Sequence, residues 1–148
     1  MRKIIDFNTA ILASLFILGI LALIHIAILT GILFFDYVPI DSLWGGKMKT
    51  VAQLLNFEIV SLLTSIIFFF LLLIRSKWLN QPKLLKVTRV AMWVAFTFFL
   101  LNTIGNVLAK IKFERMFAIV SGVLALLFLR IAIEKNGDNV LRKKQRRN

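Results

Sequence analysis

Residues 51–74 read VAQLLNFEIVSLLTSIIFFFLLLI, and every residue from Ile66 to Ile74 is apolar. At a rise of about 1.5 Å per residue, a helix of this length covers about 36 Å, more than the roughly 30 Å of hydrocarbon in a bilayer. A barrel strand would alternate apolar and polar residues, and the run from Ile66 to Ile74 does not. The stretch therefore predicts a transmembrane α-helix.

Three further apolar stretches, residues 9–35, 90–109 and 117–133, have a similar character. The chain is 59% hydrophobic with a mean hydropathy of +0.87, which excludes an ordinary soluble domain. The first stretch is too long for the roughly 7–15-residue core of a cleavable signal peptide, so we expect it to remain as an anchor. We predict an all-α, polytopic membrane protein: one domain over residues 1–148, built as an up-down-up-down bundle of four transmembrane helices.

The orientation is predicted from the distribution of the 19 lysine and arginine residues. One side of the predicted membrane domain holds most of them: Arg2, Lys3, Arg75, Lys77, Lys83, Lys86, Arg89, Lys135, Arg142, Lys143, Lys144, Arg146 and Arg147. The other side holds Lys47, Lys49, Lys110, Lys112 and Arg115, and Arg130 lies within a predicted span. Because positive charge marks the cytoplasmic face, we expect a multi-pass inner-membrane protein with both termini in the cytoplasm.

The basic tail, residues 137–148, contributes to the net charge of +12. It contains no aromatic residue on which a base could stack, so we do not expect nucleic acid as a partner. The expected partners are membrane lipids, with anionic headgroups at the cytoplasmic face, each basic residue contributing roughly 1 kcal/mol. A homo-oligomer or another membrane partner remains open.

Several kinds of chemistry are excluded by what the chain lacks. It has no cysteine and one histidine, so we expect no disulfide, no metal site and no cofactor. It also lacks a glycine-rich phosphate loop and a Gly-x-Ser-x-Gly nucleophile elbow. No residue is predicted to be catalytic, and enzyme activity is not the favoured interpretation.

Polar residues within the predicted spans gather toward their outer ends. At helical rise, His25 lies about 15 Å below the outer end of the first span, and Glu58 lies about 10 Å below the start of the second. Antiparallel neighbours would place these two side chains at similar levels. Asn102 and Asn106 occupy the corresponding part of the third span, one turn apart on the same face. Since polar groups in membranes usually face the bundle interior, we predict a polar cluster in the outer half.

Glu58 is the most informative of these residues, because a carboxylate in low dielectric is stable only when neutral or paired, and His25 is the ionisable partner at its level. Ser61 and Ser65 follow it on the same helix face, and Asn56 lies on an adjoining face. Two interpretations remain open. The His25–Glu58 pair could simply join two helices, a contact worth about 0.6–2 kcal/mol, or it could belong to a ligand pocket.

The loop over residues 36–49 contains Pro39 and the pair Gly45-Gly46, which favour turns, and Tyr37 and Trp44, which suit a membrane interface. It could form an interfacial belt with a tight return, or fold as a lid over the polar cluster. The residues predicted to bind a ligand are Glu58, His25, Asn102, Asn106, Asn56, Ser61 and Trp44.

Three segments, Asp41 to Lys47, Asn56 to Glu58 and Leu101 to Asn106, resemble a family of small four-span bacterial membrane proteins with no assigned activity. The resemblance implies a class and not a mechanism. Small multidrug exporters also use one intramembrane glutamate, but the charge bias of this chain differs from that of exporters that insert in both orientations. Four-helix sterol-isomerase-like and DoxX-like proteins share the architecture only.

These features favour a membrane protein that binds a small amphipathic or lipid-like ligand in a polar pocket in the outer half of the bundle. The same surface could instead serve an accessory membrane subunit. The alternatives are a small proton-coupled transporter that uses Glu58, and a membrane enzyme acting on an isoprenoid-type substrate, with Glu58 and His25 as acid and base. The scarcity of polar residues in the inner half argues against a pathway through the membrane.

The predicted orientation can be tested with alkaline phosphatase fusions, because this reporter is active only outside the cytoplasm. A fusion at Asn148 should be inactive and a fusion at Gly46 active. The opposite pair of activities would reverse the orientation.

Overall fold

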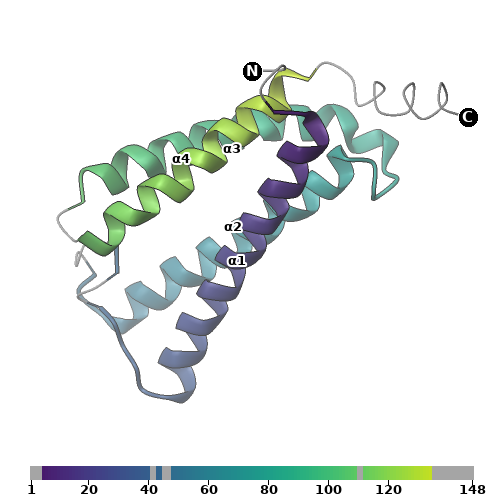
Figure 1. Cartoon of the computed structure of the whole chain (residues 1–148). Coiled ribbons are helices and arrows are strands. Elements are labelled where there is room, and N and C mark those ends of the chain that lie inside the picture. The colour runs from purple at the N-terminus through teal and green to yellow at the C-terminus, as the bar shows by residue number, and fades with distance from the viewer. Residues whose placement is uncertain (1–4, 41–42, 45–47, 110–111, 135–148) are drawn as a thin grey trace, which may run out of the picture.

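The computed structural model describes residues 5–40, 43–44, 48–109 and 112–134. Its helices are α1 (Phe7–Phe34), α2 (Val51–Arg75), a short 3-10 helix η2 (Pro82–Leu84), α3 (Leu85–Val107) and α4 (Lys112–Ile133). Four of these helices are long and apolar enough to cross a membrane. They pack as a bundle (Figure 1), which confirms the predicted fold class. The predicted basic tail, residues 137–148, lies outside the described residues.

The four helices form two hairpins. Helix α1 packs mainly against α2, and α3 mainly against α4, while the hairpins meet through α1 and α4 and to a smaller extent through α2 and α3. Figure 1 shows the hairpins close together where α1 begins and α4 ends, and apart toward the opposite end. We call these the terminal end, near Phe7 and Ile133, and the loop end, near Phe34 and Val51.

Local capping determines where α2 begins, and thereby the depth of Glu58. The Thr50 hydroxyl accepts a hydrogen bond from the amide of Gln53 at 3.2 Å, and the Gln53 side chain accepts one from the amide of Lys49 at 2.9 Å. This arrangement is a variant of the capping box, which satisfies amides that the first helical turn leaves unpaired. Helix α2 therefore starts at Val51, two turns before Glu58.

Helix α3 begins at Leu85, before the apolar stretch that the sequence analysis places from Val90. Lys86 and Arg89, the charged residues of this extra turn, are exposed, and both residue types favour helix. Pro82 lies at the start of η2, where its missing amide hydrogen costs nothing. Hydropathy alone therefore underestimates the length of α3, because its first turn precedes the apolar segment.

The hydrophobic core fills the half of the bundle nearer the terminal end. Phe68, Phe99 and Phe128, from α2, α3 and α4, form its centre, with ring centroids 5.4–5.9 Å apart. The rings of Phe99 and Phe128 are stacked at 8°, and Phe128 is fully buried. Around them pack buried residues of all four helices, among them Ile11 and Leu18 of α1 and Met92 of α3.

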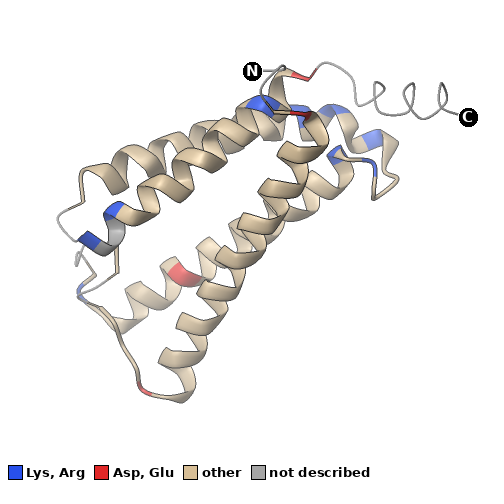
Figure 2. Ribbon diagram, in the orientation of Figure 1, with Lys and Arg blue, Asp and Glu red and all other residues tan. Residues whose placement is uncertain are grey.

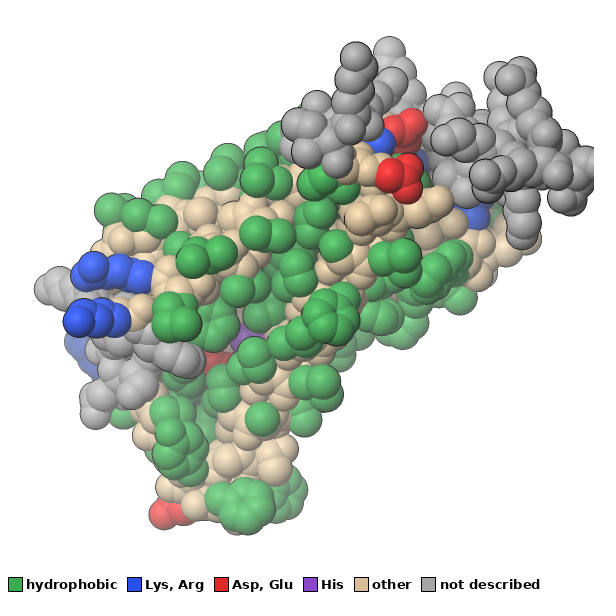
Figure 3. Space-filling view, in the orientation of Figure 1, with side chains coloured by type: hydrophobic (Ala, Val, Ile, Leu, Met, Phe, Trp, Pro, Cys, Tyr) green, Lys and Arg blue, Asp and Glu red, His purple; other side chains and the backbone are tan. Residues whose placement is uncertain are grey.

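Large apolar side chains also cover the outside of the bundle. Phe16, Leu101 and Ile119 are 70%, 63% and 71% exposed, and Figure 3 shows hydrophobic side chains over much of one face. On a soluble protein an exposed apolar surface of this extent would be a strong liability. On helices that cross a bilayer it is the lipid-facing surface, so the exposure pattern agrees with an integral membrane protein.

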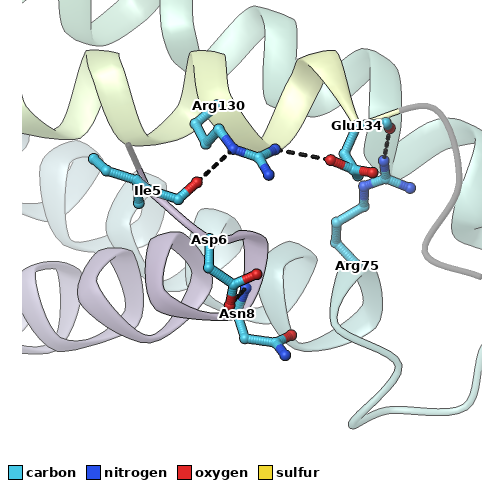
Figure 4. A network of polar contacts seen from close by, with 6 residues as sticks. All are labelled: Ile5, Asp6, Asn8, Arg75, Arg130 and Glu134. Atoms are coloured by element: carbon cyan, nitrogen blue, oxygen red, sulfur yellow. Dashed lines mark hydrogen bonds and ion pairs between the residues drawn. The ribbon is translucent and has the colours of Figure 1, made fainter. Parts of the chain in front are cut away.

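A polar network, which we call the latch, joins the helices at the terminal end (Figure 4). Arg130 of α4 donates one hydrogen bond to the carbonyl of Ile5 at 2.8 Å and another to the carboxylate of Glu134 at 2.9 Å. Arg75, the last residue of α2, donates to the Glu134 carbonyl at 2.5 Å and lies 5.9 Å from the ring centroid of Phe7. The latch thus holds α4 to the start of α1 and the end of α2.

The latch explains how an arginine is tolerated inside a predicted span. Arg130 lies within the predicted span 117–133 and forms an ion pair with Glu134 one turn later. The Arg130 side chain is only 5% exposed, so the Glu134 carboxylate and the Ile5 carbonyl replace the water that its guanidinium has lost.

We expect Glu134→Ala to destabilise the fold by about 3 kcal/mol, because it leaves the buried Arg130 without its anionic partner. Unfolding of the purified protein in detergent would measure the loss. Lys86→Ala, which removes an exposed charge from α3, is the control and should change stability by less than about 0.5 kcal/mol. Equal stability of the two variants would show that the latch contributes nothing.

Candidate ligand pocket

Glu58 joins three segments of the chain near the loop end. Its Oε2 lies 2.7 Å from Nδ1 of His25 on α1, and its Oε1 accepts a hydrogen bond of 2.8 Å from the indole Nε1 of Trp44. The residue is 1% exposed, so these two partners take the place of water for the carboxylate. The similar depths of His25 and Glu58 predicted their contact, and the structure confirms it.

Trp44 reaches this carboxylate from the segment between α1 and α2. Its ring packs on Phe57 with centroids 5.1 Å apart, and its backbone has a φ of 55°, in the left-handed region. A bulky residue there costs on the order of 1–3 kcal/mol and persists only when its surroundings hold it. The indole hydrogen bond and the Phe57 contact provide that hold, so Trp44 is drawn toward the bundle and not simply exposed at an interface.

A cavity of about 160 Å³ lies beside Glu58, toward the loop end, where the hairpins diverge. All four helices and the Trp44 segment contribute to its wall, which is formed by Leu21, Ile24, His25, Ile28, Leu43, Trp44, Glu58, Ser61, Thr64, Ser65, Phe98, Phe99, Asn102, Asn106, Phe117, Val120 and Ser121. Figure 3 shows a hollow between the hairpins, with acidic and histidine atoms visible among apolar side chains. Figure 2 shows an acidic residue within α2, well away from the charges gathered at the helix ends.

Several hydroxyl side chains away from the cavity are satisfied by their own helices. Ser14 and Thr97 each donate a hydrogen bond to the carbonyl one turn earlier, at 2.8 and 3.2 Å. In the wall of the cavity, Thr64 and Ser121 do the same. Ser121 also accepts a hydrogen bond of 3.0 Å from Thr103, which ties α4 to α3 beside the cavity.

Four polar side chains in the wall are different. Ser61 and Ser65 of α2, and Asn102 and Asn106 of α3, have no side-chain hydrogen-bond partner among the residues that the structure describes. The second ring nitrogen of His25, Nε2, is also without a partner in the described part of the chain. The cavity therefore combines apolar walls with several hydrogen-bonding groups that the protein itself does not satisfy.

The structure brings together most of the residues predicted to bind a ligand. Glu58, His25, Asn102, Asn106, Ser61 and Trp44 all line the cavity. Asn56 does not: it is exposed, because two residues correspond to about 200° around a helix and Glu58 points inward. The structure therefore places Asn56 outside the group that lines the cavity, and its part in binding stays a prediction.

Sequence reasoning missed the aromatic part of the wall, Phe98, Phe99 and Phe117. These residues belong to continuous apolar runs, and hydropathy does not show which side of such a helix faces the cavity. It placed Ser65 on the face of Glu58 without counting it as a ligand-binding residue, although that spacing was the signal that would have found it.

Comparison with known proteins adds no family: no family model, curated protein or solved structure matches the chain. The four long apolar helices support the class of small four-span membrane proteins, and the resemblance to one particular family remains a prediction. Among the residues described, no group of three or more histidine, aspartate or glutamate side chains is placed to hold a metal ion.

We expect Glu58→Gln to cost less than about 1 kcal/mol of stability, because the amide can still accept from Trp44 and hydrogen-bond to His25. Glu58→Leu should cost about 1–3 kcal/mol more, since it leaves the indole N–H and the imidazole unsatisfied. Unfolding of both variants in detergent, monitored by tryptophan fluorescence, would compare their stabilities. If the leucine variant proved as stable as the wild type, the contacts of Glu58 would not support the fold.

Proposed function

We propose that this integral membrane protein binds a small amphipathic or lipid-like molecule in the cavity at its loop end. The observation that carries the proposal is the group of unsatisfied polar side chains in a cavity whose other walls are apolar. Unpaired polar groups cost stability in a folded protein, and a ligand that hydrogen-bonds to them would recover that cost.

Binding is favoured over transport by the structure of the opposite half. Between the cavity and the terminal end lie the stacked rings of Phe99 and Phe128, the buried Leu72 and Met92, and then the latch. A proton-coupled transporter would need polar access to Glu58 from both faces, and the described residues of this half offer a packed core instead.

Binding is also favoured over an enzymatic reaction in which Glu58 and His25 act as acid and base. A general acid or base must come within hydrogen-bond reach of its substrate. Glu58 is 1% exposed, and each of its carboxylate oxygens already has a partner in His25 or Trp44. Its geometry is that of a group that positions its neighbours beside a bound molecule.

The proposed setting is a bacterial inner membrane, with the terminal end toward the cytoplasm and the cavity in the outer half. Among the described residues, Figure 2 shows basic residues concentrated at the terminal end, where Arg75, Lys77, Lys83, Lys86 and Arg89 lie. This is the distribution that the positive-inside rule associates with the cytoplasmic face. The same residues would attract anionic lipid headgroups there.

The proposal predicts a co-purifying molecule that depends on the cavity. Solvent extracts of the detergent-purified protein, analysed by mass spectrometry, should contain a lipid-like compound that Val120→Trp removes, because Val120 lines the cavity and a larger side chain would fill it. Ile119→Trp is the matched control, since Ile119 is 71% exposed, and should retain the compound.

Both variants should remain monodisperse by size exclusion, so that loss of the compound reflects occupancy and not unfolding. Extracts that contain no enriched compound from the wild type, or the same compound from both folded variants, would contradict ligand binding in this cavity.

A further inference from the structure

The unpaired side chains of the cavity come from two neighbouring helices. Ser61 and Ser65 lie one turn apart on α2, and Asn102 and Asn106 lie one turn apart on α3. Each asparagine amide carries two N–H donors and an acceptor oxygen, and each serine hydroxyl both donates one hydrogen and accepts hydrogen bonds. All four side chains can therefore donate, and they do so from two walls. A ligand with oxygen acceptors on more than one of its sides is complementary to these donors.

The electrostatics of the cavity favour an uncharged ligand. No lysine or arginine lies in its described wall, so an anionic headgroup would find no counter-charge. Glu58 is the acidic residue of the wall; its oxygens have hydrogen-bond partners at 2.7 and 2.8 Å, and the residue is 1% exposed. A cationic headgroup in the cavity would therefore have little direct access to the carboxylate. Burial of an unpaired charge in low dielectric is expensive, so neither kind of ion fits.

The dimensions of the cavity favour a ring. Its volume is about 160 Å³. In another protein, an apolar cavity of about 150 Å³ holds one benzene molecule. The side chains of Trp44, Phe98, Phe99 and Phe117 provide aromatic surface for a flat group of this size.

The surroundings of the cavity favour an apolar tail. Figure 3 shows that the hollow opens on the side of the bundle, between the hairpins. Leu23 of α1 and Ile119 of α4, each next to a residue of the cavity wall, are 67% and 71% exposed. A ligand whose ring fills the cavity could therefore leave a hydrocarbon chain among the lipids.

From these features we infer that the ligand is a quinone-type lipid: an uncharged ring with carbonyl oxygens on two sides, joined to an apolar tail. Ser61, Ser65, Asn102 and Asn106 donate hydrogen bonds to the ring oxygens. Glu58 holds His25 and Trp44 in the wall as a positioning residue. This inference rests on the proposed function and gives its ligand a chemical class.

If these serine and asparagine side chains bind the ligand directly, substitutions there should affect stability and ligand binding differently. Ser65→Ala and Asn102→Leu remove groups that have no partner among the described residues, so they should leave the unliganded protein equally stable or make it more stable. The same changes should weaken binding of a quinone by about tenfold each, because each removes a hydrogen bond that only the complex contains. Thr97→Val, on an exposed face of α3, is the control and should leave binding unchanged.

The test uses the full chain in lipid nanodiscs and four probes with the same ten-carbon tail: a decyl-substituted 1,4-benzoquinone, decanol, decanoate and decylamine. Binding is measured by the thermal shift and by titration for the wild type, Ser65→Ala, Asn102→Leu and Thr97→Val. We expect the quinone to raise the melting temperature most, and the effect to fall in the two cavity variants alone.

Each other result overturns the inference in a defined way. A larger shift with decanol would retain an uncharged ligand but exclude the ring. A larger shift with decanoate or decylamine would exclude an uncharged ligand. Absence of any shift would exclude the quinone class, while a compound lost from Val120→Trp and retained by Ile119→Trp would still support the proposed function. Equal loss of binding in Thr97→Val would show that the serine and asparagine contacts are not specific.

Discussion

The buried carboxylate of Glu58 is the constraint on which the loop end of this protein depends. A carboxylate in the membrane-spanning part of a bundle needs partners, and it finds them in His25 of α1 and Trp44 of the connecting segment. These contacts bring three segments to one point and hold Trp44 in a backbone conformation that it would otherwise avoid. The wall of the cavity is therefore built around a group that is itself almost inaccessible.

The two ends of the bundle are stabilised in different ways. In the half nearer the terminal end, the Phe68, Phe99 and Phe128 rings fill the space between helices. Arg130, paired with Glu134, donates to the carbonyl of Ile5 and so joins α4 to the segment just before α1. At the loop end the hairpins separate (Figure 1), and the side chains there enclose a cavity in place of a core. The packed half can supply the stability that allows the other half to remain open.

Ser61 and Ser65 of the cavity wall differ from several other hydroxyl residues of the helices in their hydrogen bonding. A serine or threonine on a membrane helix readily donates to a carbonyl of its own preceding turn, as Ser14 and Thr97 do. Ser61 and Ser65 do not, and both line the cavity together with Asn102 and Asn106. Polar groups left in this state are expected where a protein has been selected for binding and not for maximal stability.

The sequence by itself determined the four helices and the approximate level of the polar cluster, because helix length, hydropathy and residue spacing are local properties. It also predicted that His25 meets Glu58, since both lie at known depths on adjacent antiparallel helices. Only the tertiary structure decided that Trp44 completes the carboxylate's partners, that Asn56 points away, and that Phe98, Phe99 and Phe117 face the cavity. These outcomes depend on how each helix is rotated about its axis and on how far the hairpins diverge. Side-chain packing between distant segments sets both the rotation of each helix and the divergence of the hairpins. The sequence of an apolar run does not encode either one locally, because such a run could face lipid or core with equal ease.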